Sequence, residues 1–206
     1  CKKKHIPVFV IDSEVSDTEA VVSTIVSDNY DAGVQCAKDM MKKKTSANII
    51  IVNQKALNSI NERVKGFRDT IKGHPQYKIV EEKESAAEFE IAMKVMEKII
   101  YEKKNYDVVM GGNDPIALGC IAAMQMTDKT DQVMVYGVDG SPDGKAMIKA
   151  GFLEGTAAQS PIKIGEKAVQ TAYSYLAGET VKKHVTIPVE LITADNLKFY
   201  DMTGWQ

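Results

Sequence analysis

Short apolar runs alternate with longer amphipathic segments along most of the chain, and this alternation limits the folds that it can adopt. The runs are rich in β-branched residues, as buried strands are, and they lie at residues 6–11, 47–52, 106–111, 132–138 and 185–192. The segments between them carry apolar residues at helical spacing, over residues 30–44, 60–72, 90–103, 116–126 and 162–176. This pattern predicts an α/β fold in which right-handed βαβ units form parallel sheets.

Residues that favour helix starts support the expected helices. Asp28 or Asn29 is placed to cap the first helix. Ser59 and Glu62 form a capping-box pattern at the second helix, in which each side chain would accept a backbone N–H at the helix start. Asp114, followed by proline, predicts the start of the fourth helix.

The composition is that of an ordinary soluble globular protein. The 206 residues are enough for one large domain or two smaller lobes. Apolar residues make up 44% of the chain and charged residues 26%, with a formal net charge of −2. Such a balance gives no reason to expect nucleic acid or an anionic membrane as a partner. No apolar run approaches the roughly 20 residues that span a bilayer.

The number and spacing of the cysteines argue against a disulfide framework and against a zinc site. Three widely spaced cysteines without a CxxC pair form neither a disulfide framework nor a zinc knuckle. Cys36 and Cys120 fall on expected helices, and we predict that both are small buried residues. Cys1 is open to two interpretations, because a mature bacterial lipoprotein also begins with cysteine. The strand expected within five residues leaves no spacer after a lipid anchor, which favours a truncated start.

Polar side chains follow four of the expected strands at the points where the strands end. They are Asp12, Asn53, Asn113 and Asp139. Ligands of parallel sheets bind at the carboxyl ends of the strands. Taken singly, each residue could serve a turn or a helix cap. Together with Arg63, at the start of a helix, they favour a site for a neutral polyol, because carboxylates and amides accept hydrogen bonds from hydroxyls and arginine donates to hydroxyl oxygens.

Motifs of common enzymes and cofactor sites are missing from the sequence. There is no GxSxG, GxxxxGK[ST], GxGxxG or HExxH. DGSPDG, at residues 139–144, begins like a calcium loop, but Ala150 occupies the position of the bidentate glutamate. We therefore expect a protein that is not an enzyme and has no cofactor and no metal.

Six segments, in this order, resemble the ribose- and galactose-type periplasmic sugar-binding proteins of bacterial ABC importers, which are relatives of the lac-repressor ligand-binding core. The segments are IPVFVIDSEVS, IVSDNYDAG, NERVKGF, GGNDPIALGCIAAMQ, VYGVDGSPDGKAMIKAG and GTAAQSPIKIGEKAV. The resemblance extends from about Ile6 to the C-terminus.

The resemblance implies two Rossmann-like lobes with parallel sheets, joined by a three-segment hinge. Residues 1–26 and 160–182 would belong to the first lobe, and residues 28–158 and 185–206 to the second. Members of the family have further residues before the point where this sequence begins, and the first lobe is expected to be incomplete here. A sheet that lacks strands exposes an edge. We therefore expect an additional N-terminal segment, a complementing chain or self-association.

The resemblance also implies a ligand site made of carboxylates, amides and one arginine. Its candidate residues are Asp12, Ser13, Arg63, Asn113, Asp139 and Gln159. The carboxylates would accept sugar hydroxyls, and Arg63 would donate to ring and hydroxyl oxygens. Ser13 stands where ribose-type members carry an arginine, which leaves the sugar open. Asp114 is left with the helix-cap role.

The implied function is that of an extracytoplasmic solute-binding protein. It would bind a small sugar or polyol between its lobes, close about the hinge and deliver the ligand to the permease of an ABC transporter. Its place would be the periplasm or, lipid-anchored, the outer face of the cell membrane. The alternative is the effector-binding core of a lac-repressor-type regulator, which would need a helix-turn-helix before the first lobe. The ending ITADNLKFYDMTGWQ is more similar to the transporter branch.

Overall fold

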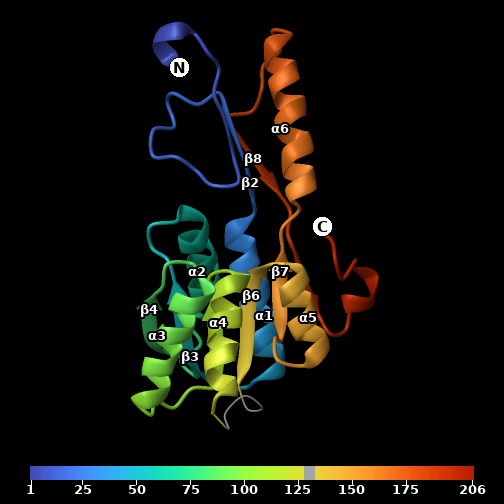
Figure 1. Cartoon of the computed structure of the whole chain (residues 1–206). Helices are drawn as coiled ribbons and strands as arrows, with labels where there is room; N and C mark the ends of the chain where they lie inside the picture. Colours follow the sequence, from blue (N-terminus) through green and yellow to red (C-terminus); the bar gives the residue numbers. More distant parts are fainter. Residues whose placement is uncertain (128–132) are drawn as a thin grey trace.

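The computed structural model describes residues 1–127 and 133–206, and it confirms the α/β fold class (Figure 1). The strands are β1 (Phe9–Ile11), β2 (Ser23–Ser27), β3 (Ala47–Asn53), β4 (Tyr77–Glu84), β5 (Val108–Gly111), β6 (Met134–Asp139), β7 (Gly155–Ala158), β8 (His184–Ile187) and β9 (Glu190–Thr193). The α-helices are α1 (Asn29–Lys43), α2 (Asn58–Ile71), α3 (Phe89–Tyr101), α4 (Asp114–Gln125), α5 (Pro142–Ala150) and α6 (Pro161–Leu176). Two 3₁₀ turns, η1 (Lys2–Lys4) and η3 (Leu197–Phe199), lie near the ends.

The strands form two separate sheets. The smaller sheet has the order β1-β2-β8, and the larger has the order β4-β3-β5-β6-β7-β9. Every pairing is parallel except that of β7 with β9. The chain passes between the sheets at residues 27–29, 158–161 and 187–190. We call the parts built on the two sheets the smaller and the larger lobe, and these three passages the crossing segments.

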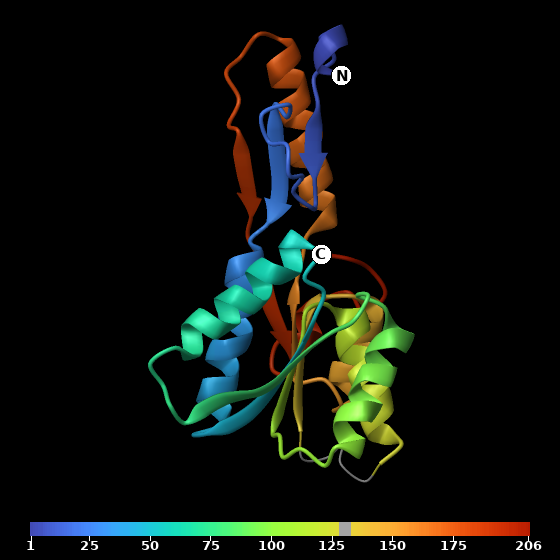
Figure 2. The ribbon, with the colours of Figure 1, turned by 90° about the vertical axis from the view of Figure 1, so that its left-hand side faces the viewer.

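The larger lobe holds most of the core. Helices α1 and α2 cover one face of its sheet, and α3, α4 and α5 cover the other (Figure 2). Because both faces are covered, the central strands carry continuous apolar runs, and residues 49–52 of β3 are all fully buried. Cys36 and Cys120 lie in this core, as the sequence predicts. No helix in the described residues is long and apolar enough to cross a membrane.

The smaller lobe has a thin core. Ile25 of β2 and Ile187 of β8 pack against Ile164 of α6, which is the helix beside this sheet (Figure 1). Large apolar side chains on the other side of α6 and on β1 stay exposed: Ile11, Ile162, Val169, Tyr173 and Leu176. Contiguous exposed apolar surface is uncommon on monomeric proteins.

The expected strand over residues 185–192 is wrong as a single element. The structure has two strands here, β8 in the smaller sheet and β9 in the larger, separated by Pro188 and Val189. Proline has no backbone N–H for a strand ladder, so the run breaks there. Residues 184–187 therefore pair with β2, although the sequence places residues from 185 onward with the second lobe.

Some elements of the structure were not predicted from the sequence. Strands β2, β4 and β7 and helix α5 were not expected. Gln132, the first residue of the expected 132–138 strand, lies outside the described residues, and β6 begins at Met134.

Two of the expected helix caps are wrong. Helix α2 begins at Asn58, after Leu57, without a side-chain capping bond, so the Ser59–Glu62 capping box does not form. Helix α4 is capped by Asn113 and not by Asp114, because the Asn113 side chain accepts the Ile116 N–H at 3.0 Å. At α1 the cap is Asp28, whose Oδ1 accepts the Asp31 N–H at 3.0 Å.

Candidate ligand-binding site

The carboxyl ends of the parallel strands in the larger sheet point towards the smaller lobe (Figure 1). Asp139 is the last residue of β6, Asn113 follows β5 and Gln159 follows β7. Parallel strands end at the same edge, so the topology alone gathers these side chains. Asp12 follows β1 of the smaller sheet and approaches the same region from the other lobe.

Arg63 is the centre of the polar contacts at this edge. It lies on α2 and is only 4% exposed. Its Nε donates to Asn29 Oδ1 at 2.8 Å, and its Nη1 donates to the Gly112 carbonyl oxygen at 2.9 Å. The same Nη1 lies 3.5 Å from Asp139 Oδ1. A buried guanidinium needs such partners, because an unpaired charge inside a protein is costly.

Close packing of two helices brings Arg63 to Asn29. Gly33 of α1 lies against α2, and a Cβ at this position would stand 1.8 Å from the Arg63 carbonyl oxygen. Only glycine lets the two backbones approach so closely. The first turn of α1, which holds Asn29, is thereby set beside the guanidinium.

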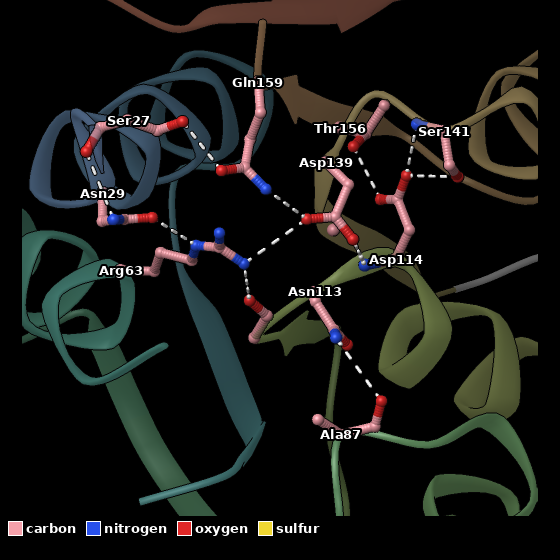
Figure 3. Close-up of polar contacts among 12 residues, drawn as sticks. Ser27, Asn29, Arg63, Ala87, Asn113, Asp114, Asp139, Ser141, Thr156 and Gln159 are labelled. Carbon is pink, nitrogen blue, oxygen red and sulfur yellow. Dashed lines mark hydrogen bonds and ion pairs between the residues drawn. The ribbon is translucent and has the colours of Figure 1, made fainter. Parts of the chain in front are cut away.

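Hydrogen bonds and one ion pair join the site residues into a closed ring (Figure 3). Gln159 Nε2 donates to Asp139 Oδ1 at 2.8 Å, and Gln159 Oε1 accepts from Ser27 Oγ at 2.7 Å. Asn29 Nδ2 donates to the Ser27 carbonyl oxygen at 3.2 Å, and Arg63 connects Asn29 to Asp139. Ser27 and Gln159 belong to two crossing segments, so the ring ties both segments to the strand ends of the larger lobe.

Asp114 is a buried structural carboxylate behind this ring. It is fully buried, and its Oδ2 accepts the Ser141 N–H at 2.9 Å and the Ser141 hydroxyl at 2.6 Å. Its Oδ1 accepts the Thr156 hydroxyl at 2.6 Å. Its backbone N–H donates to Asp139 Oδ2 at 3.3 Å. The cap role predicted for Asp114 is therefore wrong, and this residue instead joins β6, β7 and α5.

Asn113 lies beside the ring but has no bond to it (Figure 3). Its Oδ1 caps α4, and its Nδ2 donates weakly to the Ala87 carbonyl oxygen at 3.5 Å. The residue is partly exposed. A ligand contact of Asn113 stays a prediction, and it would use the second amide hydrogen.

Asp12 and Asp139 face a shared cavity between the lobes. Its volume is about 370 Å³, and its lining is formed by Asp12, Asp139, Gln159, Pro161, Ile164 and Trp205. This volume lies in the usual range of small-molecule sites, about 300–1,000 Å³. Ser13 does not line the cavity, but its hydroxyl donates to Asp12 Oδ2 at 3.0 Å. The structure thus brings Arg63, Asp139 and Gln159 into contact, with Asp12 across the cavity.

Both carboxylates of the cavity sit on unusual backbone. Asp12 has a φ of 70° and Asp139 a φ of 148°. Non-glycine residues rarely adopt positive φ, and such strain tends to occur at functional sites. The strain supports a functional use of these two strand ends.

Burial controls the charges of the site. It raises the pKa of Asp139 to about 7, although Arg63 opposes the shift, and the nearby Asp114 carboxylate adds to it. Burial likewise raises the pKa of Asp114. The pKa of Arg63 is lowered by burial, yet arginine keeps its charge in proteins. Two carboxyls near one guanidinium favour a site in which one carboxyl is readily protonated.

The raised pKa of Asp139 predicts a pH dependence of stability. In the unfolded chain an aspartate titrates near pH 3.9, so between about pH 4 and 7 the folded protein binds more protons than the unfolded one. Rising pH should therefore destabilise the wild type, by on the order of 3 kcal/mol over this range, and Asp139→Asn should lose most of that dependence. Urea unfolding at several pH values measures it, and parallel curves for the two proteins would contradict the shift.

Several residues of the network were missed by sequence reasoning. Ser27, Asn29, Ser141 and Thr156 carry no motif that distinguishes them from turn and cap residues. Asn29 was considered only as a helix cap. Within the described residues, no group of three or more His, Cys, Asp or Glu is placed to hold a metal ion.

Comparison with known proteins identifies the family. The model of the periplasmic binding protein domain matches residues 1–180. The chain belongs to this family. Among the curated periplasmic binding proteins, the ribose import binding protein of Escherichia coli (strain K12) is 31% identical over 191 residues, which are 91% of this chain and 63% of that protein. The D-apiose import binding protein of Paraburkholderia graminis is 32% identical over 205 residues, 98% of this chain and 65% of that protein.

Solved structures of periplasmic binding proteins have the same fold. A solute-binding protein of Bacillus halodurans with bound myo-inositol has a TM-score of 0.90 at 25% identity, over 97% of this chain and 70% of its own. The Caulobacter myo-inositol binding protein has a TM-score of 0.87 at 26% identity, over 96% of this chain and 69% of its own. This periplasmic binding protein chain therefore spans a little less than two thirds of the length of these curated relatives.

Proposed function

We propose that this chain is part of an extracytoplasmic solute-binding protein that captures a small sugar or polyol between two lobes and delivers it to the permease of an ABC transporter. The observation that carries the proposal is the polar ring at the strand ends, which includes Arg63, Asp139 and Gln159, with Asp12 facing it across the interlobe cavity. The relatives that bind ribose, apiose or myo-inositol support this ligand class.

The chemistry of the cavity suits a neutral polyhydroxy compound. Asp12 and Asp139 offer carboxylate oxygens to hydroxyl donors, and bonds to ionised acceptors are stronger than neutral ones. Gln159 and Arg63 already hold Asp139, so its orientation is set before a ligand arrives. A preorganised acceptor of this kind reduces the entropy that binding costs. A carboxylate ligand would be disfavoured, because both cavity carboxylates would repel it.

Closure about the crossing segments is the proposed binding motion. A ligand that contacts Asp12 on one lobe and Asp139 on the other stabilises the arrangement in which the two approach each other. The lobes also touch at the surface, where Asn58 Nδ2 donates to Glu14 Oε2 at 2.6 Å. This exposed contact is of the kind that contributes little energy, so it can be remade during closure.

The proposal includes partners and a location. The permease of an ABC importer would receive the ligand, in the periplasm or at the outer face of the cell membrane. The exposed apolar side chains of β1 and α6 would be covered by a further segment of the same protein, by a complementing chain or by self-association. The relatives, which are longer than this chain, support the first of these.

Asp12→Ala is expected to weaken sugar binding without a loss of stability. Asp12 is exposed, and its side chain accepts a hydrogen bond from its neighbour Ser13. Losing a charge-assisted hydrogen bond should raise Kd roughly 10- to 30-fold. The measurement is a thermal-shift screen of the protein from its complete reading frame against pentoses, hexoses and inositols, followed by titration with each sugar that stabilises it.

Asp17→Ala is the matched control, because Asp17 is an exposed carboxylate of the same loop that lines neither the 370 Å³ cavity nor the neighbouring 210 Å³ cavity. Its Kd should equal that of the wild type. A wild type that no sugar or polyol stabilises would refute the proposed ligand class. Equal affinities in the Asp12 and Asp17 variants would remove Asp12 from the site.

A further inference from the structure

The C-terminal segment returns to the interlobe cavity after it leaves the larger sheet. From β9 the chain passes through η3 and a turn at residues 201–204, and its end lies between α5 and the lower end of α6 (Figure 1). Trp205 then lines the 370 Å³ cavity with Asp12, Asp139 and Gln159. Trp205 is the aromatic residue in the lining of this cavity, and it is 47% exposed.

A buried lysine holds this segment in place. Lys145 of α5 is fully buried, and its Nζ donates to the Gly204 carbonyl oxygen at 2.6 Å and to the Asp201 carbonyl oxygen. Asp201 Oδ1 also accepts the backbone N–H and the hydroxyl of Thr203, both at 2.9 Å, which tightens the turn. A buried ammonium must be well partnered. The two carbonyls are those partners, so the position of the segment is coupled to the position of Lys145.

We propose that Trp205 is a ligand-contacting residue whose indole packs on the apolar face of the bound ring, and that Lys145 is the residue that positions it. The inference rests on the proposed function, since it names a further contact in the same cavity. Cyclic sugars and inositols present hydroxyls around the ring edge and C–H groups on the ring faces. The cavity offers matching chemistry, with oxygen acceptors from Asp12 and Asp139 and a flat apolar surface from Trp205.

The partial exposure of Trp205 fits this role. About half of this residue is open to the cavity and solvent, so its indole is still available to a ligand. Covering it with a ligand removes apolar surface from water and lowers the free energy of the complex. The contact favours ligands that have an exposed C–H face, and acyclic polyols, which lack a rigid face, should gain less from it.

Fluorescence and affinity together test the assignment. Trp205→Ala is expected to raise Kd for the stabilising sugar about tenfold, whereas Trp205→Phe, which keeps an aromatic face, should change it less than about threefold. The difference in emission between wild type and Trp205→Phe isolates the signal of Trp205. Saturating sugar should shift this signal to shorter wavelength and protect it from acrylamide. Phe199→Ala is the control, because Phe199 lies in the same segment, is 77% exposed and does not line the cavity.

Lys145→Met tests the positioning role. It should increase acrylamide quenching of Trp205 in the free protein and raise Kd about as much as Trp205→Ala does. The double variant Lys145→Met with Trp205→Ala should not raise Kd further. If this variant does not fold, the Trp205 variants still decide the contact. Unchanged affinity in Trp205→Ala, with no change of the Trp205 emission at saturation, would overturn the assignment alone. A wild type that binds no sugar would overturn the proposed function and the assignment with it.

Discussion

Asp114→Ala is expected to lower the free energy of unfolding by about 3 kcal/mol, because it removes the acceptor for three hydrogen bonds inside the core. The Ser141 N–H and the hydroxyls of Ser141 and Thr156 would lose this partner in a fully buried place. Chemical unfolding at pH 7 measures the change.

Close packing around the carboxylate supports this magnitude. Cβ atoms at Gly137 and Gly144 would stand 2.4 and 2.5 Å from the Asp114 oxygens, so the surroundings fit a carboxylate and leave little room for anything else. The alanine variant would therefore leave a small cavity lined with polar groups.

Asn113→Ala is the matched control for the Asp114 variant. Asn113 caps α4 through one hydrogen bond to the Ile116 N–H and is partly exposed, so its removal should cost about 1 kcal/mol. If the two neighbouring variants lost equal stability, Asp114 would not be the buried centre described above. A larger loss in Asn113→Ala would reverse the two roles.

Arg63→Met is expected to cost about 3–5 kcal/mol of stability and to abolish sugar binding. The variant leaves Asp139 largely buried without its counterion and removes the link to Asn29 and the Gly112 carbonyl. Loss of one partner of a buried charge pair is usually more harmful than loss of both. Urea unfolding and calorimetric titration measure the two effects.

The double variant Arg63→Met with Asp139→Asn separates pairing from packing. Because it buries no unpaired charge, it should be more stable than Arg63→Met alone, with a coupling energy of about 1–3 kcal/mol in the double-mutant cycle. Sugar binding should stay absent, since the ionised carboxylate acceptor of Asp139 and the guanidinium that orients it are both gone. Strictly additive losses would mean that the 3.5 Å approach of Arg63 to Asp139 contributes no coupling.

The sequence was a good guide wherever local patterning decides structure. The buried strands β3, β5 and β6 read as apolar runs because helices cover both faces of their sheet. Strand β4, YKIVEEKE, was missed because it lies at the sheet edge and carries charged residues, and most of it is not buried. Strand β7, GTAA, has little propensity of its own, and its place between β6 and β9 is decided by tertiary pairing.

The candidate site was predictable only in part. Strand ends of a parallel sheet gather by topology, so Asn113 and Asp139 could be named from the sequence. Gln159 and the detailed role of Arg63 came from the family resemblance. The path of the chain after β5 decides whether Asn113 or Asp114 caps α4. The dipeptide Asp114-Pro115 favoured Asp114 in the sequence analysis, whereas Asn113 is the cap. The contributions of Ser27 and Asn29 depend on how the crossing segment approaches Arg63, which no local pattern encodes.

Calorimetric titration of the protein from its complete reading frame with ribose, apiose and myo-inositol is the decisive test of the proposed ligand site. We expect saturable one-to-one binding of at least one of these or a related sugar. We also expect that binding to be lost in the folded double variant Arg63→Met with Asp139→Asn. Saturable binding with unchanged affinity in the double variant would contradict this assignment, because the polar ring that includes Arg63 and Asp139 would then not be the ligand site.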